Sequence, residues 1–284
     1  MKSTISGTAG RRVCPEGEAI PLESASADWQ LPAFRKQEFH PRQHRYALCV
    51  FVINEGERFR AQLDRMRPLA DQIDIIIADG GSTDGSTAPD HLAHAGVRTL
   101  LVKTGPGRLS AQMRMALAYA MKESYQGVVV MDGSNKDDPS DVDRFIEALD
   151  KRYDHVQGSR YVSGGKGINT PLIRHYGVKL LHAPVISIAA GFRYTDTTNG
   201  FRAYSRRFLL DPRVAPFREI FSNYELHYYL AIRAARLGYR CIEVPVSRTY
   251  PRNADVPTKI RGVPGNARLL RTLLLAAIGK WNPN

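Results

Sequence analysis

Ile75-Ile76-Ile77-Ala78-Asp79-Gly80-Gly81-Ser82-Thr83-Asp84-Gly85-Ser86 is the stretch that decides the fold. An apolar run ends there in a carboxylate, and flexible, hydroxyl-rich residues follow it. This pattern predicts a buried strand that delivers Asp79 to a ligand. A second stretch of the same kind is Val128-Val129-Val130-Met131-Asp132-Gly133-Ser134. We therefore expect two strands to bring acidic residues to the carboxyl edge of one sheet, where open α/β sheets bind ligands.

Apolar runs and amphipathic segments alternate around these two strands. They predict an α/β fold with a mostly parallel central sheet flanked by helices. Strands are expected near 46–53, 73–79, 97–102 and 127–131, with helices near 56–68, 86–94, 108–123 and 139–150.

The second half of the chain is less regular. Its pattern predicts a strand near 154–158, a Gly-rich loop at 163–167, a helix near 171–190, a polar turn at 196–199, a strand near 200–205, a helix near 222–237 and a strand near 240–246. We expect three parts: an N-terminal extension at 1–44 that wraps the domain or stays mobile, a catalytic domain at 45–262, and a helical tail at 263–284.

The chain is basic, with 40 Lys and Arg against 28 Asp and Glu, so its formal net charge is +12. This excess suits anionic partners such as nucleotides, lipid phosphates or a membrane surface, and a solubilising surface is the alternative. Nucleic acid is not expected as a partner because no recognised binding motif focuses the charge. Three cysteines without a C-x-x-C pair indicate a reducing cytoplasm.

Two apolar segments, 183–190 and 269–278, fall short of the roughly 18–20 residues that span a bilayer. The N-terminus lacks the apolar core of a signal peptide. The tail helix carries leucines on one face, which indicates core packing or a homodimer contact, or else a basic amphipathic helix on an anionic membrane. A cytoplasmic protein is expected, soluble or attached to the inner face of the membrane.

Six ordered landmarks resemble the family 2 glycosyltransferases, within them the branch of dolichol-phosphate mannosyltransferase and other polyprenyl-phosphate sugar transferases. Each landmark alone is a weak signal, whereas six in the order of the family are a strong one. They are Asn54-Glu55; Asp79 through Ser86; Met131-Asp132-Gly133-Ser134 with Asp138-Pro139; Gly158-Ser159-Arg160-Tyr161 with Gly164-Gly165; Asp196 with Asn199-Gly200-Phe201-Arg202; and Glu243-Val244-Pro245-Val246.

The resemblance implies a GT-A fold and transfer of a sugar from a UDP- or GDP-sugar, with inversion. The acceptor that the resemblance implies is a polyprenyl phosphate or a hydroxyl of a sugar or metabolite, as in the synthesis of cell-surface polysaccharides. In the family, the acids that match Glu55 and Asp79 lie beside the nucleoside. A second acid of that turn is replaced here by Gly80. The residues assigned to donor binding in this part of the chain are Asn54, Glu55, Asp79, Gly81, Ser82 and Arg108.

Asp132 is the strongest candidate for a catalytic residue. In the family, this strand end carries Asp-x-Asp, which binds Mg²⁺ or Mn²⁺ on the donor diphosphate. Ser134 replaces the second acid, which weakens the metal site. Lys136 could supply a fixed positive charge in place of part of the metal, whereas Asp137 and Asp138 could restore the missing ligand. The expected metal ligands are therefore Asp132, Ser134 and Asp137, in a site that is weak or dispensable.

The remaining candidates follow from later landmarks. Arg160 and Arg174 resemble arginines that bind the acceptor phosphate, and Asn199 is placed with them. Arg202 and Lys259 are expected at the donor phosphates. If the acceptor is a hydroxyl, a general base is needed, and Glu225 and Asp196 are the available carboxylates.

Two other functions compete with this interpretation. A sugar nucleotidyltransferase would need a Gly-rich, Arg-containing loop after the first strand, where Asn54-Glu55-Gly56-Glu57 stands instead. A catalytically silent nucleotide-binding module is suggested by the acids lost at Gly80 and Ser134.

Overall fold

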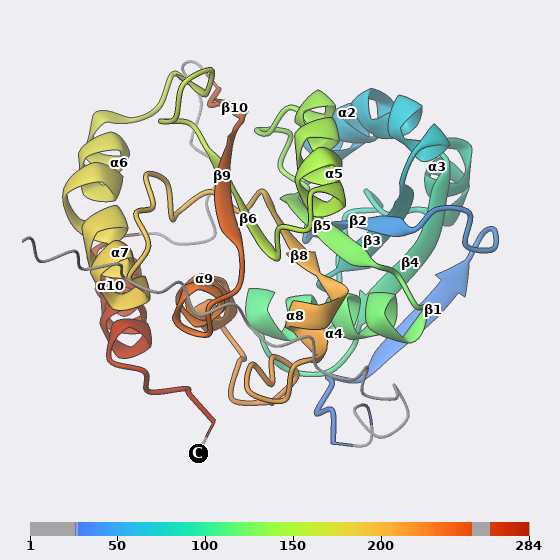
Figure 1. The fold of residues 1–284 in the computed structure, drawn as a ribbon. Coiled ribbons are helices and arrows are strands. Elements are labelled where there is room, and N and C mark those ends of the chain that lie inside the picture. The colour runs from blue at the N-terminus through green and yellow to red at the C-terminus, as the bar shows by residue number, and fades with distance from the viewer. Residues whose placement is uncertain (1–25, 27, 252–261, 284) are drawn as a thin grey trace, which may run out of the picture.

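A computed structural model describes residues 26, 28–251 and 262–283. Within these residues, an eight-stranded sheet has the order β1-β4-β3-β2-β5-β8-β6-β9 (Figure 1). All its strands run in one direction except β1 and β8, which are antiparallel to their neighbours. The strands are β1 (Phe34–Glu38), β2 (Tyr46–Val52), β3 (Asp74–Asp79), β4 (Val97–Lys103), β5 (Gly127–Asp132), β6 (His155–Ser159), β8 (Arg202–Ser205) and β9 (Cys241–Pro245).

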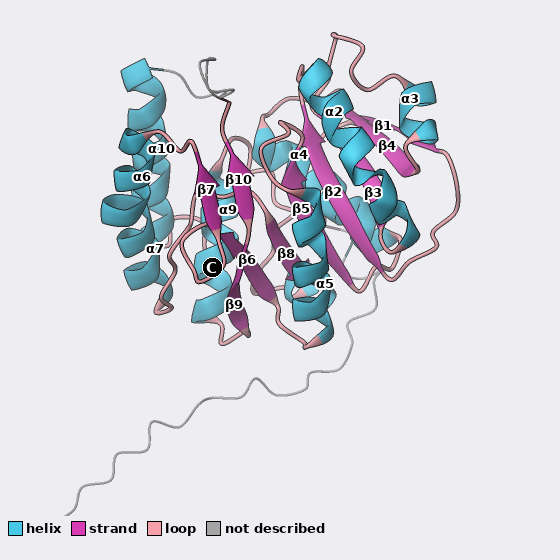
Figure 2. Ribbon diagram, turned by 90° about the horizontal axis from the view of Figure 1, so that it is seen from above, coloured by secondary structure: helices cyan, strands magenta, loops and turns pink. Residues whose placement is uncertain are grey.

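Helices cover both faces of this sheet (Figure 2). The central strand β2 is buried along its whole length, and its side chains alternate between two cores. Cys49 packs against the helix after β4, whereas Leu48 packs against the helices after β2 and β5. The helices are α2 (Glu57–Met66), α3 (Pro89–His94), α4 (Leu109–Lys122), α5 (Val142–Asp150), α8 (Arg206–Leu210) and α9 (Glu225–Arg236), with short 3₁₀ turns η1 (Arg67–Asp71) and η2 (Pro139–Asp141).

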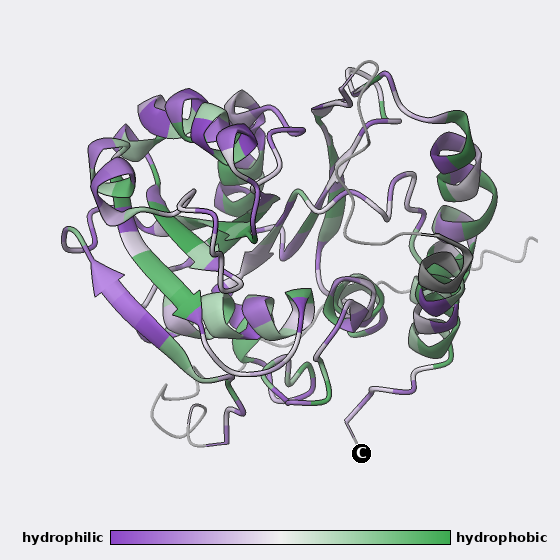
Figure 3. Cartoon of the chain, turned by 180° about the vertical axis from the view of Figure 1, so that it is seen from behind, coloured by the Kyte–Doolittle hydropathy of each residue, from purple (hydrophilic) through white to green (hydrophobic). Residues whose placement is uncertain are grey.

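The expected mostly parallel α/β sheet is confirmed, and its first four parallel strands lie where the apolar runs predict them. Three strands were not among the predicted elements. Strand β1 lies inside the segment expected as an extension and pairs with β4, and its charged residues leave the sheet edge hydrophilic (Figure 3). The Gly-rich loop contains β7 (Lys166–Ile168), which forms a separate two-stranded parallel sheet with β10 (Ser247–Thr249). The proposed boundaries of the three parts of the chain stay a prediction.

A helical layer stands beside the β6–β9 end of the sheet (Figures 1 and 2). The helix expected over 171–190 is formed by α6 (Leu172–Gly177), a π-helical turn η3 (Val178–His182) and α7 (Ala183–Ala190). Helix α10 (Gly262–Ala277) packs on α7 and α9, with Leu273 fully buried and Ile278, just after it, 77% exposed. In the part of the chain that the structure describes, no helix combines the length and apolar character needed to cross a bilayer.

Candidate active site

The carboxyl edge of the sheet gathers the candidate residues, because β3 and β5 flank β2 in parallel register. Asp79 pairs with Val52, and Asp132 pairs with Phe51 on the other side of β2. Since β6 and β9 run in the same direction as β5, the residues after these strands reach the same edge. The sequence-based expectation that both acids lie at one edge is therefore confirmed.

Asp79 shapes the turn that follows it. Its carboxylate accepts hydrogen bonds from the backbone N–H groups of Gly81 (3.0 Å) and Ser82 (2.8 Å) and from the hydroxyls of Ser82 (2.7 Å) and Thr87 (2.7 Å). The residue is 1% exposed. These bonds use the carboxylate within its own loop, so Asp79 positions the loop that would contact a donor. A direct contact between Asp79 and the donor stays a proposal.

The loops after β2 and β3 are joined by hydrogen bonds. The Asn54 N–H donates to Ser82 Oγ (3.0 Å), and Asn54 Oδ1 accepts from the Thr83 N–H (2.8 Å). Glu55 pairs with Arg58 (2.9 Å) one helical turn further on. Asn54 and Ser82 thus form one surface beside the sheet edge, and as donor contacts they stay a proposal.

Asp132, at the end of β5, is held in place by neighbours that the sequence analysis did not identify. The fully buried Gln62 of α2 donates to the Asp132 backbone carbonyl (2.9 Å) and accepts from the Asn135 N–H (2.5 Å). A Cβ on Gly200 would lie 3.0 Å from Asp132 Oδ1, a tight contact that would push this carboxylate aside. The Asp132 side chain remains 30% exposed and can meet a ligand.

Arg248 of β10 is the cation that pairs with Asp132. Its Nη2 donates to Asp132 Oδ2 (3.0 Å), while Nη1 donates to both carboxylate oxygens of Asp137 (2.7 and 2.5 Å) and to Asn199 Oδ1 (3.2 Å). Arg248 is 4% exposed and Asp137 is fully buried. The expected role of Asp137 as a metal ligand is therefore corrected, because an arginine already holds its carboxylate. A single cation after an apolar strand was the only sequence signal for Arg248.

A divalent ion does not fit the residues expected to bind it. Asp137 is bound by Arg248, and Ser134 offers only a buried hydroxyl, which has no hydrogen-bond partner among the described residues. Across residues 28–251 and 262–283, no three His, Cys, Asp or Glu side chains are grouped so that they could hold a metal ion. In this loop, Asp132 (30% side-chain exposure) and Asp138 (41%) keep exposed carboxylates, and Asp138 pairs with Arg65.

Lys136 lies close to the same carboxylates and is 8% exposed. Burial, reinforced by Arg248, lowers the pKa of its ammonium group. Burial alone would raise the pKa of Asp132, but the positive charges of Arg248 and Lys136 outweigh it, so that pKa is lowered. Asp132 is consequently an anion held between two cations.

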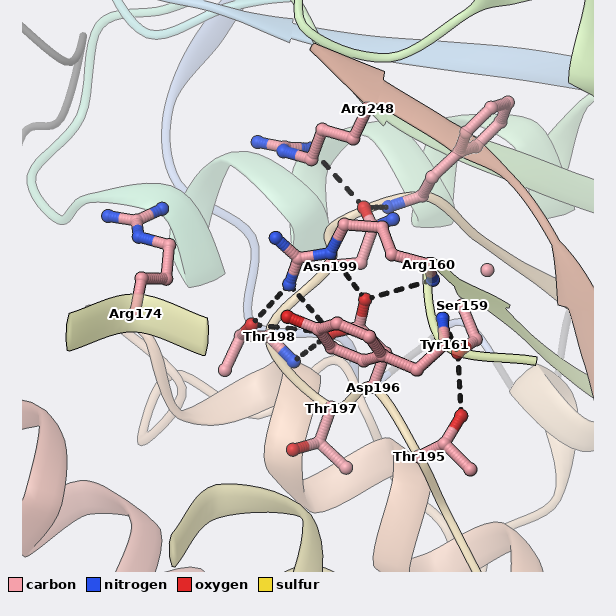
Figure 4. Close-up of polar contacts among 12 residues, drawn as sticks. Ser159, Arg160, Tyr161, Arg174, Thr195, Asp196, Thr197, Thr198, Asn199 and Arg248 are labelled. Carbon is pink, nitrogen blue, oxygen red and sulfur yellow. Dashed lines mark hydrogen bonds and ion pairs between the residues drawn. The ribbon is translucent and has the colours of Figure 1, made fainter. Parts of the chain in front are cut away.

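Arg160 and Asp196 form a buried ion pair (Figure 4). Arg160 Nε donates to Asp196 Oδ2 (2.7 Å) and Nη2 donates to Oδ1 (2.9 Å), with the two side chains 1% and 0% exposed. Arg160 also donates to the hydroxyls of Tyr250 (3.0 Å) and Thr198 (3.1 Å). Both expectations are corrected here: Asp196 is bound on both oxygens and is not a general base, and Arg160 is committed to the protein interior.

Two other expected contacts take structural positions. The Arg202 guanidinium is 1% exposed and donates to the backbone carbonyls of Thr197 (2.7 Å), Asn199 (3.0 Å) and His227 (2.6 Å), so it is not placed at the donor. Glu225 begins α9, is 8% exposed, and accepts from the Asn223 N–H (2.7 Å). Its carboxylate thus binds the loop just before its own helix, and α9 has no side-chain cap.

Arg174 of α6 and Tyr250 complete the site. Arg174 Nη1 lies 3.4 Å from the Tyr250 hydroxyl, which also accepts from Arg160. Burial would raise the pKa of Tyr250, but Arg248, Arg160 and Arg174 outweigh it and lower that pKa. Asn199 Nδ2 is buried with no hydrogen-bond partner in the described structure.

Two expected donor contacts are less closely tied to this centre. Arg108 is exposed and directly precedes α4, so its assignment stays a proposal. Lys259 lies outside the described residues.

The mostly parallel sheet, with acidic and cationic side chains at its carboxyl edge, is the arrangement of the GT-A fold. A family model described as glycosyl transferase family 2 matches residues 48–211, and the chain belongs to that family. The chain is therefore a glycosyltransferase, as the six landmarks predict. The nucleotidyltransferase alternative is not supported.

Similar proteins agree with this assignment. Undecaprenyl-phosphate mannosyltransferase of Micrococcus luteus is 30% identical over 211 residues, which cover 72% of this chain and 83% of the relative. Polyprenol monophosphomannose synthase of Mycolicibacterium smegmatis is 29% identical over 72% of this chain and 77% of its own length. The structure of glucosyl-3-phosphoglycerate synthase from Mycobacterium tuberculosis, with Mn²⁺, UDP and phosphoglyceric acid, matches with a TM-score of 0.59 and 19% identity, covering 93% of this chain and 82% of that one. This likeness establishes the shared fold.

Proposed function

We propose that this glycosyltransferase moves a hexose from a UDP- or GDP-sugar to a polyprenyl phosphate at a membrane surface, with inversion. The names of the Micrococcus luteus and Mycolicibacterium smegmatis relatives support this acceptor class. The nucleoside would lie along the loops of Asn54 and Ser82, and the diphosphate beside Asp132 at the end of β5. Cations are concentrated at that end of the sheet, as an anionic leaving group requires.

The observation that carries the acceptor assignment is the two-sided character of α6. On the inner side, Arg174 reaches the Tyr250 hydroxyl and offers a guanidinium fork suited to a phosphate. On the outer side, Leu172 is 74% exposed and Ile173 is 89% exposed. One short helix therefore combines a phosphate-binding group with apolar surface, which is the chemistry of a lipid phosphate.

The carboxylates of the site also favour a phosphate acceptor. A hydroxyl acceptor needs a general base, whereas a phosphate oxygen is already a nucleophile. Asp196 is bound by Arg160, and Glu225 accepts from the Asn223 backbone N–H, so both carboxylates already have partners within the protein. In the proposed step, an acceptor phosphate oxygen bonds to the anomeric carbon. The bond from that carbon to the donor diphosphate breaks, and its electron pair leaves with the nucleoside diphosphate.

The direct test is product formation from purified protein. GDP- and UDP-sugars are each mixed with polyprenyl phosphate in detergent, and the lipid product is identified by mass spectrometry. A glycosyl polyprenyl phosphate with an equal amount of nucleoside diphosphate is expected, and the matched polyprenol without phosphate should give none. Transfer only to hydroxyl acceptors would contradict the proposal. Nucleotide binding without turnover of any donor would favour the catalytically silent module.

We further propose that the outer face of the helical layer rests on an anionic membrane. Tyr176 (57%), Leu180 (74%) and Ile188 (78%) continue the exposed apolar surface of α6 along η3 and α7. The positive net charge of the chain complements anionic lipid headgroups.

Vesicles of anionic lipid, sedimented with the protein, test this membrane contact. The Ile173→Lys/Leu180→Lys variant should lose binding. Ile220→Lys is the matched control because Ile220, 45% exposed, precedes α9 outside the helical layer. Equal losses in the two variants would reject the face. Concentration-dependent dimerisation that the double variant abolishes, without vesicle binding by the wild type, would assign the face to a second copy of the chain.

A further inference from the structure

The Arg248 guanidinium lies within the loop where a divalent ion is expected. It bridges the carboxylate of Asp132, at the end of β5, and the carboxylate of Asp137, in the loop that follows β5. Both its terminal nitrogens are used, and the residue is 4% exposed. A metal bound by these acids would have to displace a buried arginine and leave its charge unpaired, which is costly.

The charges of this centre balance without a metal. Asp132 and Asp137 supply two negative charges, and Arg248 and Lys136 supply two positive charges. A site with two carboxylates and one divalent cation has the same sum. Ser134 stands at the position of the second acid in the expected metal motif. The carboxylate that would strengthen metal binding is therefore missing from the same loop that holds an extra cation.

Two buried polar atoms beside this centre point to an additional ligand. Ser134 Oγ and Asn199 Nδ2 have no hydrogen-bond partner within the described residues. Asn199 is tied to the centre because its Oδ1 accepts from Arg248 (3.2 Å). A hydroxyl and an amide N–H are donors that suit phosphate oxygens.

We propose that Arg248, together with Lys136, replaces the divalent ion, so that this transferase binds the donor diphosphate and releases it without a metal. The inference rests on the proposed function, since it takes a nucleoside diphosphate sugar as the donor. When the bond between the sugar and the diphosphate breaks, the departing oxygen gains negative charge. Arg248 and Lys136 stabilise this charge from fixed positions, as a preorganised site does.

Calorimetric titration with UDP and GDP tests the proposal without relying on turnover. We expect the wild type to bind one of them equally well in EDTA and in excess Mn²⁺, and to show no bound Mn²⁺ by electron paramagnetic resonance. Binding that requires Mn²⁺ overturns this inference alone. Failure to bind either nucleotide under both conditions overturns the proposed function with it.

Substitutions test whether Arg248 and Lys136 themselves contribute to nucleotide binding. Arg248→Met/Asp137→Asn removes the pair without leaving a buried unpaired charge, and should weaken nucleotide binding in EDTA by about 10- to 100-fold, as expected for hydrogen bonds to a charged group. Lys136→Met provides a second readout if that variant does not fold. Arg65→Met is the control, because Arg65 pairs with the nearby Asp138 and is 43% exposed. Unchanged binding in both site variants contradicts the proposal.

A variant that gains metal binding would give the most direct support for this proposal. Ser134→Asp added to Arg248→Met/Asp137→Asn restores the paired acids and removes the guanidinium. This triple variant should bind Mn²⁺ by electron paramagnetic resonance, and Mn²⁺ should restore the nucleotide affinity that the double variant loses. A triple variant that binds no Mn²⁺ but keeps wild-type nucleotide affinity would show that Arg248 does not occupy the place of the metal.

Discussion

Arg160→Met should destabilise the protein strongly, because Arg160 is part of a buried ion pair. Its guanidinium makes two hydrogen bonds to Asp196, and the side chains are 1% and 0% exposed, so solvent does not screen the pair. Removing the cation leaves a buried carboxylate with only weak local partners. Breaking such a pair costs about 3–5 kcal/mol, a large share of the roughly 5–15 kcal/mol that stabilises a typical domain.

Urea unfolding of a double-mutant cycle measures this cost. Arg160→Met and Asp196→Leu should each lower the free energy of unfolding. The double variant should lose less than the sum, since neither charge is then left unpaired; coupling between contacting residues reaches about 0.5–3 kcal/mol. The acceptor KM of folded Arg160→Met should stay near the wild-type value. A loss of less than about 1 kcal/mol in the free energy of unfolding, with a large rise in acceptor KM, would refute this interpretation. That result would indicate that Arg160 binds the acceptor phosphate.

Three further predictions concern the site and its support. Gly200→Ala places a Cβ 3.0 Å from Asp132 Oδ1 and should reduce turnover about 100-fold with little change in melting temperature; full activity would contradict this contact. Asp132→Ala should abolish turnover but keep cooperative unfolding, since Arg248 retains Asp137, and near-wild-type activity would reject the site. Burial holds the pKa of His155 well below its ordinary value, so below about pH 6.5 the unfolded chain binds a proton that the folded chain does not. The free energy of unfolding should then fall by about 1.4 kcal/mol for each pH unit of acidification. For His155→Gln, the free energy of unfolding, measured by denaturation between neutral and mildly acidic pH, should fall less steeply. Equal pH dependence in the variant and the wild type would contradict the role of His155.

The parallel strands could be predicted because each is an apolar run that ends abruptly. β2, β3 and β5 are buried on both faces, so their sequences need no alternation, and Asp79 and Asp132 mark their ends. Edge strand β1 escaped prediction because it is charged and largely exposed, and only its pairing with β4 makes it a strand.

The candidate residues could be located from sequence, but their partners could not. Whether Arg160 and Asp196 face a ligand or each other depends on a contact across 36 positions, which the sequence does not reveal. Arg248 reaches Asp132 across 116 positions from a three-residue strand, which local patterns do not reveal. The pairing of Arg248 with Asp132 becomes visible only in the fold, which places β10 beside this loop.

A crystal structure with the bound nucleoside diphosphate, grown in EDTA, tests the central claim most directly. We predict that the diphosphate lies at the carboxyl edge of β2, β3 and β5, beside Asp132, with its oxygens facing Lys136 and Arg248. A diphosphate bound on any other face of the molecule would contradict the account.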